Sequence, residues 1–343
     1  MKRLLITALL ICLPRLVFAQ ATQFYLEDSI ADKWKVKIYV IGEAQAKTQI
    51  QESLYSAMDH AKLTYDKLDA DNPSSELGSI NQKKIKDNYM VSPELARAVA
   101  IGLDVSRWTD GYFDITFDSE EPNYKKVDVK LKDNELKIKE YNLVINLRYM
   151  LPGFLADQIA DEMNTAGWKN CLVKVGDMFV ARGNDINGPW RVPVVTPTEK
   201  YAKRALFYKA TDVAASTVTT NSGPINIINP KTKSGTNSDL KSVTIFTVSA
   251  AKAEALATGI YVMGMANGKT FLAKNKNLRA VLGDMQGNLT FIPDYKQGAG
   301  TATEVLPTSP TPVLEQAAPS PSPPAAQMKS NPKAKIERAG IGQ

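Results

Sequence analysis

The sequence predicts an α+β fold in which mixed sheets are packed by helices. Helical patterns and strand-like runs follow one another without the regular strand–helix repeat of a parallel α/β protein. After an N-terminal apolar segment, no stretch approaches the roughly 20 apolar residues that a membrane span needs. The patterned part runs from residue 20 to 296, which is a plausible length for one large domain.

The first 19 residues have the pattern of a secretory signal. Basic residues precede an apolar run from residue 4 to 13, and the small residue Ala19 ends the segment. Cleavage would lower the formal charge from +6 to +3, since it removes Lys2, Arg3 and Arg15 and no acidic residue. That charge does not indicate a nucleic-acid partner. We expect an exported, periplasmic protein with no transmembrane segment in its mature chain.

Residues 297–343 differ in composition from the domain before them. They are rich in Pro, Ala, Ser and Thr, a composition that cannot build a core. We therefore expect a disordered tail. Its last part carries Lys329, Lys333, Lys335 and Arg338, which leaves contact with an acidic surface as an alternative.

Periodicity and capping residues predict the first elements of the domain. Alternating apolar and polar residues indicate a strand at 34–41, and an apolar stripe at helical spacing follows from 44 to 68. Ser92 precedes a Pro-Glu pair, which is typical of a helix start. We expect that helix to end near Trp108.

The middle and the end of the domain combine further strands with a third helix. Three β-prone runs between 127 and 147 are joined by turns near Asp133 and Tyr141, which suggests a meander. The third helix is expected from Pro152 to near Gly167. The other predicted strands are 172–175, 191–195, 225–228, 242–248 and 280–283.

Several kinds of chemistry lack the residues they require. His60 is the only histidine, and Cys171 is the only cysteine outside the signal segment, so the usual zinc, haem and Ser–His sites are disfavoured. No intramolecular disulfide is possible in the mature chain. No Gly-rich run followed by Lys and Ser or Thr is found. Chemistry would therefore rest on carboxylates, hydroxyls, backbone groups and a hard metal ion.

The run SAAKAEALATG at residues 249–259 predicts a helix with paired oxygen ligands. Ser249 can cap its start, and Glu254 and Thr258 lie four residues apart, on one face. A carboxylate and a hydroxyl suit Mg²⁺ that is shared with substrate phosphates. A solvated Glu and a Thr bonded to its own helix are the ordinary alternative.

Six segments of the domain stand out as motifs: SSELGSIN (74–81), TDGYFDIT (109–116), PGFLAD (152–157), LVKVGDMFVARG (172–183), NIINPKT (226–232) and the helix at 249–259. In order and spacing they resemble motifs of the ApbE family of FAD:protein FMN transferases, across most of residues 34 to 292. The resemblance implies a single ApbE-like domain. It also implies an activity in which FMN passes from FAD to a threonine of an acceptor protein while AMP leaves.

The resemblance also implies residue roles. Mg²⁺ would be held by Glu254, Thr258 and the carbonyl of Leu151, and FAD would be the substrate. The family pattern further implies contacts with the flavin nucleotide from Asn81, Asp114, Asp157 and Gly176. The acceptor would be an extracytoplasmic flavoprotein. The TDGYFDIT segment and Gly176 have an alternative role in shaping turns.

The sequence departs from the family pattern mainly at charged and glycine positions. Pro152 replaces a lysine, Asn226 a histidine, Asn229 an aspartate and Lys233 a glycine. Neither asparagine can act as a general base at neutral pH. Three functions therefore stay open: a flavin transferase with a rewired site, an inactive or weakly active flavin-binding relative, and a protein-interaction relative with no flavin role.

Overall fold

The computed structural model describes residues 21–194, 204–220, 226–293 and 305–307. The predicted signal segment lies outside these residues, and so does the predicted tail apart from a short strand at 305–307. All described residues belong to one compact unit, which ends at Thr308. None of the helices in this part of the chain combines the length and apolar character that a membrane span requires.

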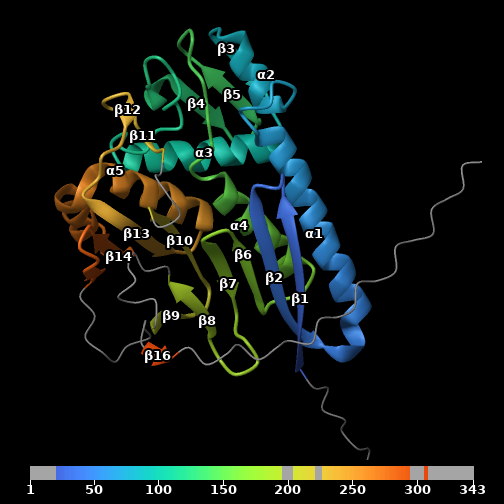
Figure 1. Cartoon of the computed structure of the whole chain (residues 1–343). Helices are drawn as coiled ribbons and strands as arrows, with labels where there is room; N and C mark the ends of the chain where they lie inside the picture. The colour runs from blue at the N-terminus through green and yellow to red at the C-terminus, as the bar shows by residue number, and fades with distance from the viewer. Residues whose placement is uncertain (1–20, 195–203, 221–225, 294–304, 308–343) are drawn as a thin grey trace, which may run out of the picture. The chain divides into compact units, whose positions relative to one another are not determined.

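An eight-stranded sheet forms the centre of the fold (Figure 1), and its strand pairs are antiparallel. In spatial order the strands are β1 (Ala21–Ile30), β2 (Trp34–Glu43), β6 (Cys171–Val175), β7 (Met178–Arg182), β10 (Val213–Thr219), β13 (Leu240–Thr247), β14 (Arg279–Asp284) and β15 (Leu289–Ile292). The strands predicted at 34–41, 172–175, 242–248 and 280–283 are confirmed in this sheet.

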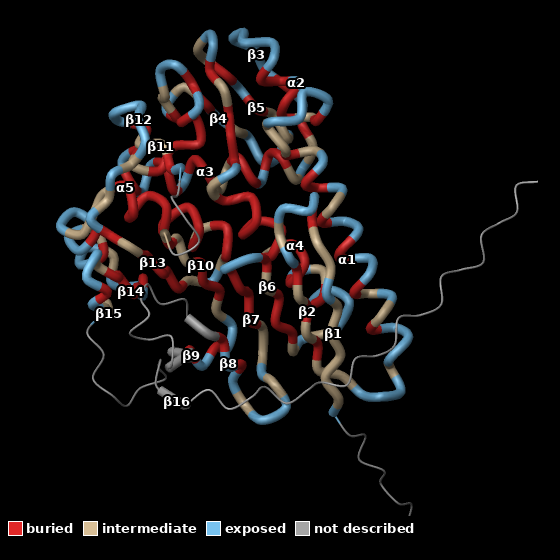
Figure 2. The backbone as a smooth tube through the Cα atoms, in the orientation of Figure 1, coloured by how far each residue is buried: buried red, intermediate tan, exposed pale blue. Residues whose placement is uncertain are grey.

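Three helices pack against one face of this sheet. They are α1 (Lys47–Leu68), α4 (Leu151–Thr165) and α5 (Ala250–Lys274). Along a strand, side chains alternate between the two faces, so Val173 joins the core under the helices while Leu172 joins a second cluster on the other face. That second face is covered by β8 (Trp190–Val194), which pairs with β9 (Arg204–Ala210), next to β16 (Val305–Pro307). Figure 2 shows the buried strands between the two layers.

A smaller sheet with its own helices lies near the C-terminal end of α1 (Figure 1). Its strands are β3 (Asp87–Met90), β5 (Glu135–Ile138) and β4 (Val127–Lys130), with β5 in the middle, and its helices are α2 (Glu76–Lys83) and α3 (Pro93–Trp108). A hairpin of β11 (Ile228–Asn229) and β12 (Ser234–Gly235) and two short 3₁₀ turns, Ala44–Ala46 and Tyr124–Lys126, complete the described elements.

The predicted meander at 127–147 is only partly right. Its first two runs are β4 and β5, but the third run is not a strand, and β3 takes its place beside β5. The side-chain amide of Asn81 explains the difference. It donates to the carbonyl oxygen of Ile145 at 2.8 Å and accepts from the same residue's N–H at 3.0 Å. The backbone groups of Ile145 are therefore bound to a side chain and not to a neighbouring strand.

The strand predicted at 225–228 is also reduced to the two residues of β11, and residue 225 lies outside the described part.

The predicted helix starts are confirmed at Ser92 and Ser249. The Ser92 hydroxyl accepts from the N–H of Leu95 at 3.3 Å, and the Ser249 hydroxyl accepts from the N–H of Lys252 at 3.3 Å. Both contacts satisfy a backbone donor of the first helical turn. Helix α5 continues well beyond Gly259 and is kinked at Gly264, where φ is +76°. These caps fix where each helix begins, and therefore where its first side chains point.

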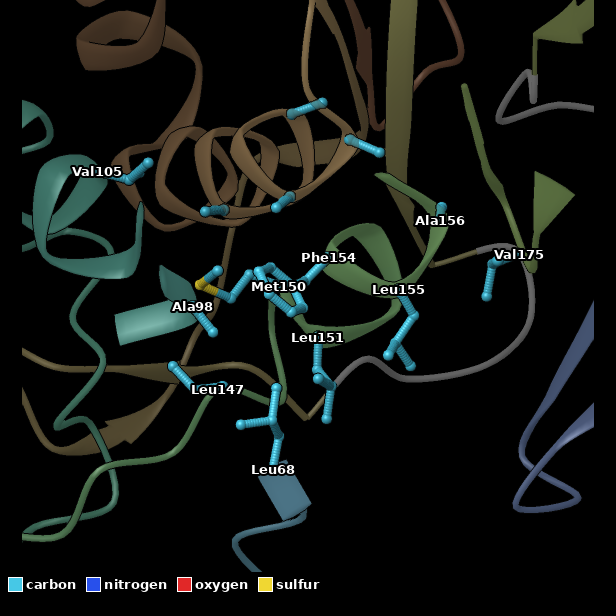
Figure 3. Close-up of a cluster of buried hydrophobic side chains, with 14 of the residues drawn as sticks. Leu68, Ala98, Val105, Leu147, Met150, Leu151, Phe154, Leu155, Ala156 and Val175 are labelled. Carbon is cyan, nitrogen blue, oxygen red and sulfur yellow. The ribbon is translucent and has the colours of Figure 1, made fainter. Parts of the chain in front are cut away.

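The start of α4 packs closely against the start of α5. A Cβ atom at Gly153 would lie 2.5 Å from the carbonyl oxygen of Ala250 and 2.8 Å from the nitrogen of Ala251. Both are backbone atoms, so neither can rotate away. Figure 3 shows a cluster of buried apolar side chains around the start of α4, with Leu151 next to Leu68 of α1 and Met150 near Phe154. Only a glycine allows the two helices to approach so closely.

We expect Gly153→Ala to lower the free energy of unfolding by about 2 to 3 kcal/mol, because the added methyl group forces the two helix starts apart. Urea denaturation measures the change. Gly235→Ala is the matched control, since a Cβ atom there meets open space, and it should change stability by less than about 0.5 kcal/mol. Equal effects of the two substitutions would contradict the close approach.

Candidate functional site

The contact between α4 and α5 brings Glu254, one of the predicted metal-binding residues, to the start of α4. Glu254 projects from the second turn of α5, and its Oε2 accepts a hydrogen bond of 2.9 Å from the N–H of Gly153. Leu151, two residues before Gly153, is the first residue of α4. Thr258 lies one turn after Glu254 and is buried, with 3% of its surface exposed. The carboxyl and the start of α4 thus meet at one helix junction, and the hydroxyl lies one turn further along α5.

Burial controls the ionisation of Glu254. Loss of solvent raises the pKa of its carboxyl from 4.5 to about 8, against the opposing effect of the Gly153 hydrogen bond, and the nearby charge of Asp157 raises it further. A carboxyl with this pKa is mostly protonated at neutral pH. The group therefore packs between the helices mainly in its neutral form.

Asp157 caps the start of α5. Its Oδ1 accepts from the N–H of Ala250 at 2.8 Å, while its Oδ2 accepts from the Ser249 hydroxyl at 2.6 Å and from the N–H of Ala251 at 3.0 Å. Burial raises the pKa of Asp157 despite these hydrogen bonds. The position of this carboxylate at a helix N-terminus is the one that favours negative charge. All three donors belong to α5 and its cap.

Asp114 organises the loop that follows α3. Its Oδ1 accepts from both the N–H and the hydroxyl of Thr116 at 2.7 Å, and its Oδ2 accepts from the N–H of Tyr124 at 3.1 Å. Burial raises its pKa, which these hydrogen bonds oppose. Thr109 closes the helix end by bonding to the carbonyl of Val105 at 2.8 Å. The TDGYFDIT segment thus has a clear role in shaping the loop.

The two remaining predicted contacts, Asn81 and Gly176, have roles in local structure. The Asn81 amide is bound to Ile145, as described above. Gly176 forms the turn between β6 and β7 with φ of +56°, and a Cβ atom there would meet open space. The turn therefore requires the left-handed conformation but no close approach. Lys233 also has a positive φ, +59°, at the position where a glycine was expected. The hairpin therefore keeps its backbone shape without the glycine.

Three cavities border the motif segments. One, of about 190 Å³, is lined by Phe154, Asp157, Arg182, Ser249 and their neighbours. The other two have different linings. A cavity of about 480 Å³ is lined by residues from the loop after α3 and from the β11–β12 hairpin, among them Asp114, Lys125, Pro230, Lys231 and Lys233. A cavity of about 250 Å³ is lined by Trp34, Tyr65, Arg148, Leu151 and their neighbours. Neither Glu254 nor Thr258 lines any of the three cavities. Leu151 is the only member of the predicted metal set that does.

The side chains next to these cavities were missed by the sequence analysis. Tyr149 donates its hydroxyl to the carbonyl of Asn226 at 2.7 Å, and Lys231 lies 4.2 Å from the ring centre of Tyr112. These contacts join residues far apart in the sequence. No local pattern could have indicated them.

The sequence analysis gave no catalytic role to His60 or Cys171, and the structure places one in a surface ion pair and the other in the buried core. His60 is exposed and pairs with Glu162 at 3.0 Å on the outer surface of α1 and α4. Cys171 is buried in β6, and burial raises the pKa of its thiol to about 11. A thiol with this pKa is not a nucleophile at neutral pH.

The profile of the ApbE family matches residues 32–121 and 118–282. A FAD:protein FMN transferase of Escherichia coli K12 is 27% identical over 261 residues, which cover 64% of this chain and 72% of that protein. A FAD:protein FMN transferase of Vibrio cholerae is 24% identical over 239 residues, covering 59% of this chain and 70% of that protein.

Solved structures share the fold. The flavin transferase ApbE from Vibrio cholerae superposes with a TM-score of 0.68 at 20% identity, covering 79% of this chain and 97% of that one. This likeness confirms the predicted α+β architecture of helices packed on sheets.

Proposed function

The chain belongs to the ApbE family, and from that membership we propose that it is an exported flavin-nucleotide-binding protein in which FMN transfer from FAD is strongly reduced. Curated relatives with detectable sequence similarity are FAD:protein FMN transferases, which supports flavin as the ligand class. The conserved architecture supports retention of a nucleotide site. The residues at the helix junction support the reduction in transfer.

The hydrogen bond from the Gly153 N–H to Glu254 Oε2 carries this proposal. A backbone donor occupies one of the two carboxylate oxygens, Oε2, and so competes with a metal ion for this side chain. The donor also belongs to the first turn of α4, where the helix dipole places partial positive charge that favours anions over cations. Within the described residues, no group of three His, Cys, Asp or Glu side chains could hold a metal ion, so a metal at this junction would depend on the Thr258 hydroxyl and the Leu151 carbonyl besides Glu254. In this arrangement Glu254, Thr258 and Leu151 do not fit Mg²⁺, which demands near-octahedral oxygen ligands.

The substituted residues support the same proposal. Pro152 is buried at the start of α4 and carries no charge to offer a pyrophosphate. Asn229 uses its side-chain oxygen to accept from the N–H of Lys231 at 2.9 Å, so it shapes the hairpin turn. The groups that would neutralise phosphate charge or move a proton are therefore replaced by groups that stabilise local structure.

An active transferase is the second candidate, because Glu254 contacts the start of α4, where Leu151 lies, and Thr258 is one turn further along α5. In that case Glu254 would have to ionise and leave the Gly153 N–H to bind Mg²⁺. The acceptor would be an extracytoplasmic flavoprotein that presents a threonine. This candidate requires a rearrangement that the first does not.

Incubation of the purified protein with FAD, Mg²⁺ and an acceptor domain separates the two. We expect flavin binding, measured by fluorescence, without covalent flavin on the acceptor or released AMP above the level without protein. The Escherichia coli relative serves as the positive control. Covalent transfer that disappears in Glu254→Ala would favour the active transferase. Failure to bind any flavin would contradict both and leave a protein-interaction role.

A further inference from the structure

The 190 Å³ cavity lies where α3, α4 and the start of α5 meet the ends of β7 and β13. Its lining combines cationic, acidic, amide and apolar side chains: Arg97, Arg182, Asp157, Asp161, Gln158, Ile101, Phe154 and Val248, with Ser249 beside them. It shares no lining residue with the other two cavities. A cavity of this size is well below the roughly 300 Å³ at which protein pockets accept drug-sized ligands, so its ligand must be small.

Neither arginine of this lining has a close carboxylate partner in the described part of the chain. The Arg97 guanidinium lies 5.2 Å from the ring centre of Phe154. Arg182, whose side chain is 22% exposed, donates to two backbone carbonyls at 3.3 and 3.5 Å, and its Nη2 is 4.0 Å from Asp161 Oδ1. These contacts are long, since a guanidinium and a carboxylate normally meet at about 2.7 to 2.9 Å. Both arginines can therefore accept an anionic group of a ligand.

Two acceptors in the same lining lack a good donor. Gln158 is 9% exposed, and its buried Oε1 has no hydrogen-bond partner among the described residues. Its Nε2 donates to Glu162 Oε1 at 3.0 Å, which leaves Oε1 as the free end of the amide. Asp161 is the second acceptor, because its carboxylate makes only the long contact with Arg182 within the described residues. A ligand that supplies a donor here would relieve the cost of an unpaired buried oxygen.

The balance of charges in the lining indicates what kind of ligand fits. Two guanidinium groups face two carboxyl groups, and the carboxyl of Asp157 is already bound to three donors of α5 and its cap. A simple anion such as phosphate would meet the arginines but also the free acceptors, and a simple cation would meet the reverse. A zwitterion satisfies both sets, because its carboxylate can face the arginines while its ammonium group faces the acceptors. The three apolar side chains leave a place for an aliphatic group.

We propose that this cavity is a binding site for a small aliphatic α-amino acid. The site goes beyond flavin binding and does not depend on it, since its lining residues are separate from those of the other two cavities. The bound amino acid would contact α3, α4 and the start of α5 together. It would therefore stabilise the folded protein by mass action.

Isothermal titration calorimetry on the purified protein tests the proposal with L-alanine, L-valine and L-leucine. Two analogues of valine separate the roles of its charges: 3-methylbutanoate lacks the ammonium group, and 2-methylpropylamine lacks the carboxylate. We expect valine to bind at least about tenfold more tightly than either analogue.

Substitutions locate the site within the protein. Arg97→Gln, Arg182→Gln and Asp161→Ala should each weaken valine binding about tenfold. Arg107→Gln is the matched control, because Arg107 lies on the same helix as Arg97, is exposed and does not line this cavity. It should change valine affinity by less than about twofold.

The possible results separate the alternatives. Failure of all three amino acids to bind at concentrations up to about 10 mM overturns the site. Equal affinity for valine and 3-methylbutanoate overturns the zwitterion and leaves a plain anion site. Equal losses in Arg97→Gln and Arg107→Gln overturn the location. Circular dichroism and a thermal melt establish that each variant is folded, and Arg97→Gln and Asp161→Ala change exposed side chains, so they decide the test if Arg182→Gln does not fold.

Discussion

Replacing Glu254 with glutamine is expected to raise the free energy of unfolding by about 3 to 4 kcal/mol at pH 7.5 and to leave it nearly unchanged below about pH 4. The wild-type carboxyl is buried, and its pKa is raised to about 8 by loss of solvent. Glutamine has nearly the same shape as the protonated acid. Its side-chain oxygen can still accept the hydrogen bond from Gly153, so the native contact is kept.

The dependence on pH follows from proton binding in the two states. Below pH 4.5 the Glu254 carboxyl holds a proton in both the folded and the unfolded chain, and it adds no pH dependence. Between 4.5 and about 8 the unfolded chain loses the proton while the folded chain keeps it, so wild-type stability falls as the pH rises. Above about 8 the penalty is constant. Glutamine has no proton to lose and removes the whole effect.

Urea denaturation of both proteins across this pH range gives the comparison. Glu120→Gln serves as the control, because Glu120 is exposed and the same chemical change there should alter stability little at any pH. Parallel stability curves for wild type and Glu254→Gln would mean that Glu254 is ionised in the folded protein. Stabilisation of the wild type by added Mg²⁺, absent in Glu254→Gln, would favour the active transferase.

Local signals in the sequence were sufficient for the elements that carry their own start and stop. The helix starts at Ser92 and Ser249 were predicted because a capping hydroxyl acts on the next few backbone groups. The strand at 34–41 was predicted because one of its faces is buried and the other is not. In each case the energetic cause lies within a few residues of the element itself.

Long-range contacts explain where the sequence analysis failed. The β-prone run at 143–147 has the composition of a strand, but Asn81, more than sixty residues earlier, takes the backbone groups of Ile145. Arg148 and Tyr149 belong to no sequence motif. The ring of Tyr149 contacts Phe117 and its hydroxyl contacts Asn226, and these contacts form only in the folded chain. Tertiary partners of this kind leave no periodic trace in one sequence.

The candidate site was also predicted only in part, since the sequence indicated its residues but not their contacts. The sequence placed Glu254 and Asp157 at one site through family resemblance, and the structure does bring both to the junction of α4 and α5. Burial and hydrogen-bond partners decide what each carboxyl can do, and neither quantity is visible in the motif. Asp157 was expected to contact the nucleotide, but its carboxylate accepts three hydrogen bonds from the start of α5.

Asp157→Ala should accordingly lower the free energy of unfolding by about 3 to 5 kcal/mol, since each buried donor left without a partner costs about 1 to 3 kcal/mol. The substitution removes the acceptor for the N–H groups of Ala250 and Ala251 and for the Ser249 hydroxyl. It also removes a negative charge from the helix N-terminus. Urea denaturation measures the loss, and amide hydrogen exchange should show the first turn of α5 opening most.

Asp161→Ala is the matched control, one turn further along α4. Its carboxylate is 64% exposed, and its ion pair with Arg182 is long, at 4.0 Å. Its removal should therefore cost less than about 0.5 kcal/mol. If Asp157→Ala costs no more than that, the capping role is wrong. If Asp157→Ala instead leaves stability intact but abolishes flavin binding, the carboxylate contacts the nucleotide directly. A loss of flavin binding in a destabilised variant has the simpler explanation that the start of α5, with Glu254 on its second turn, has lost its anchor to α4.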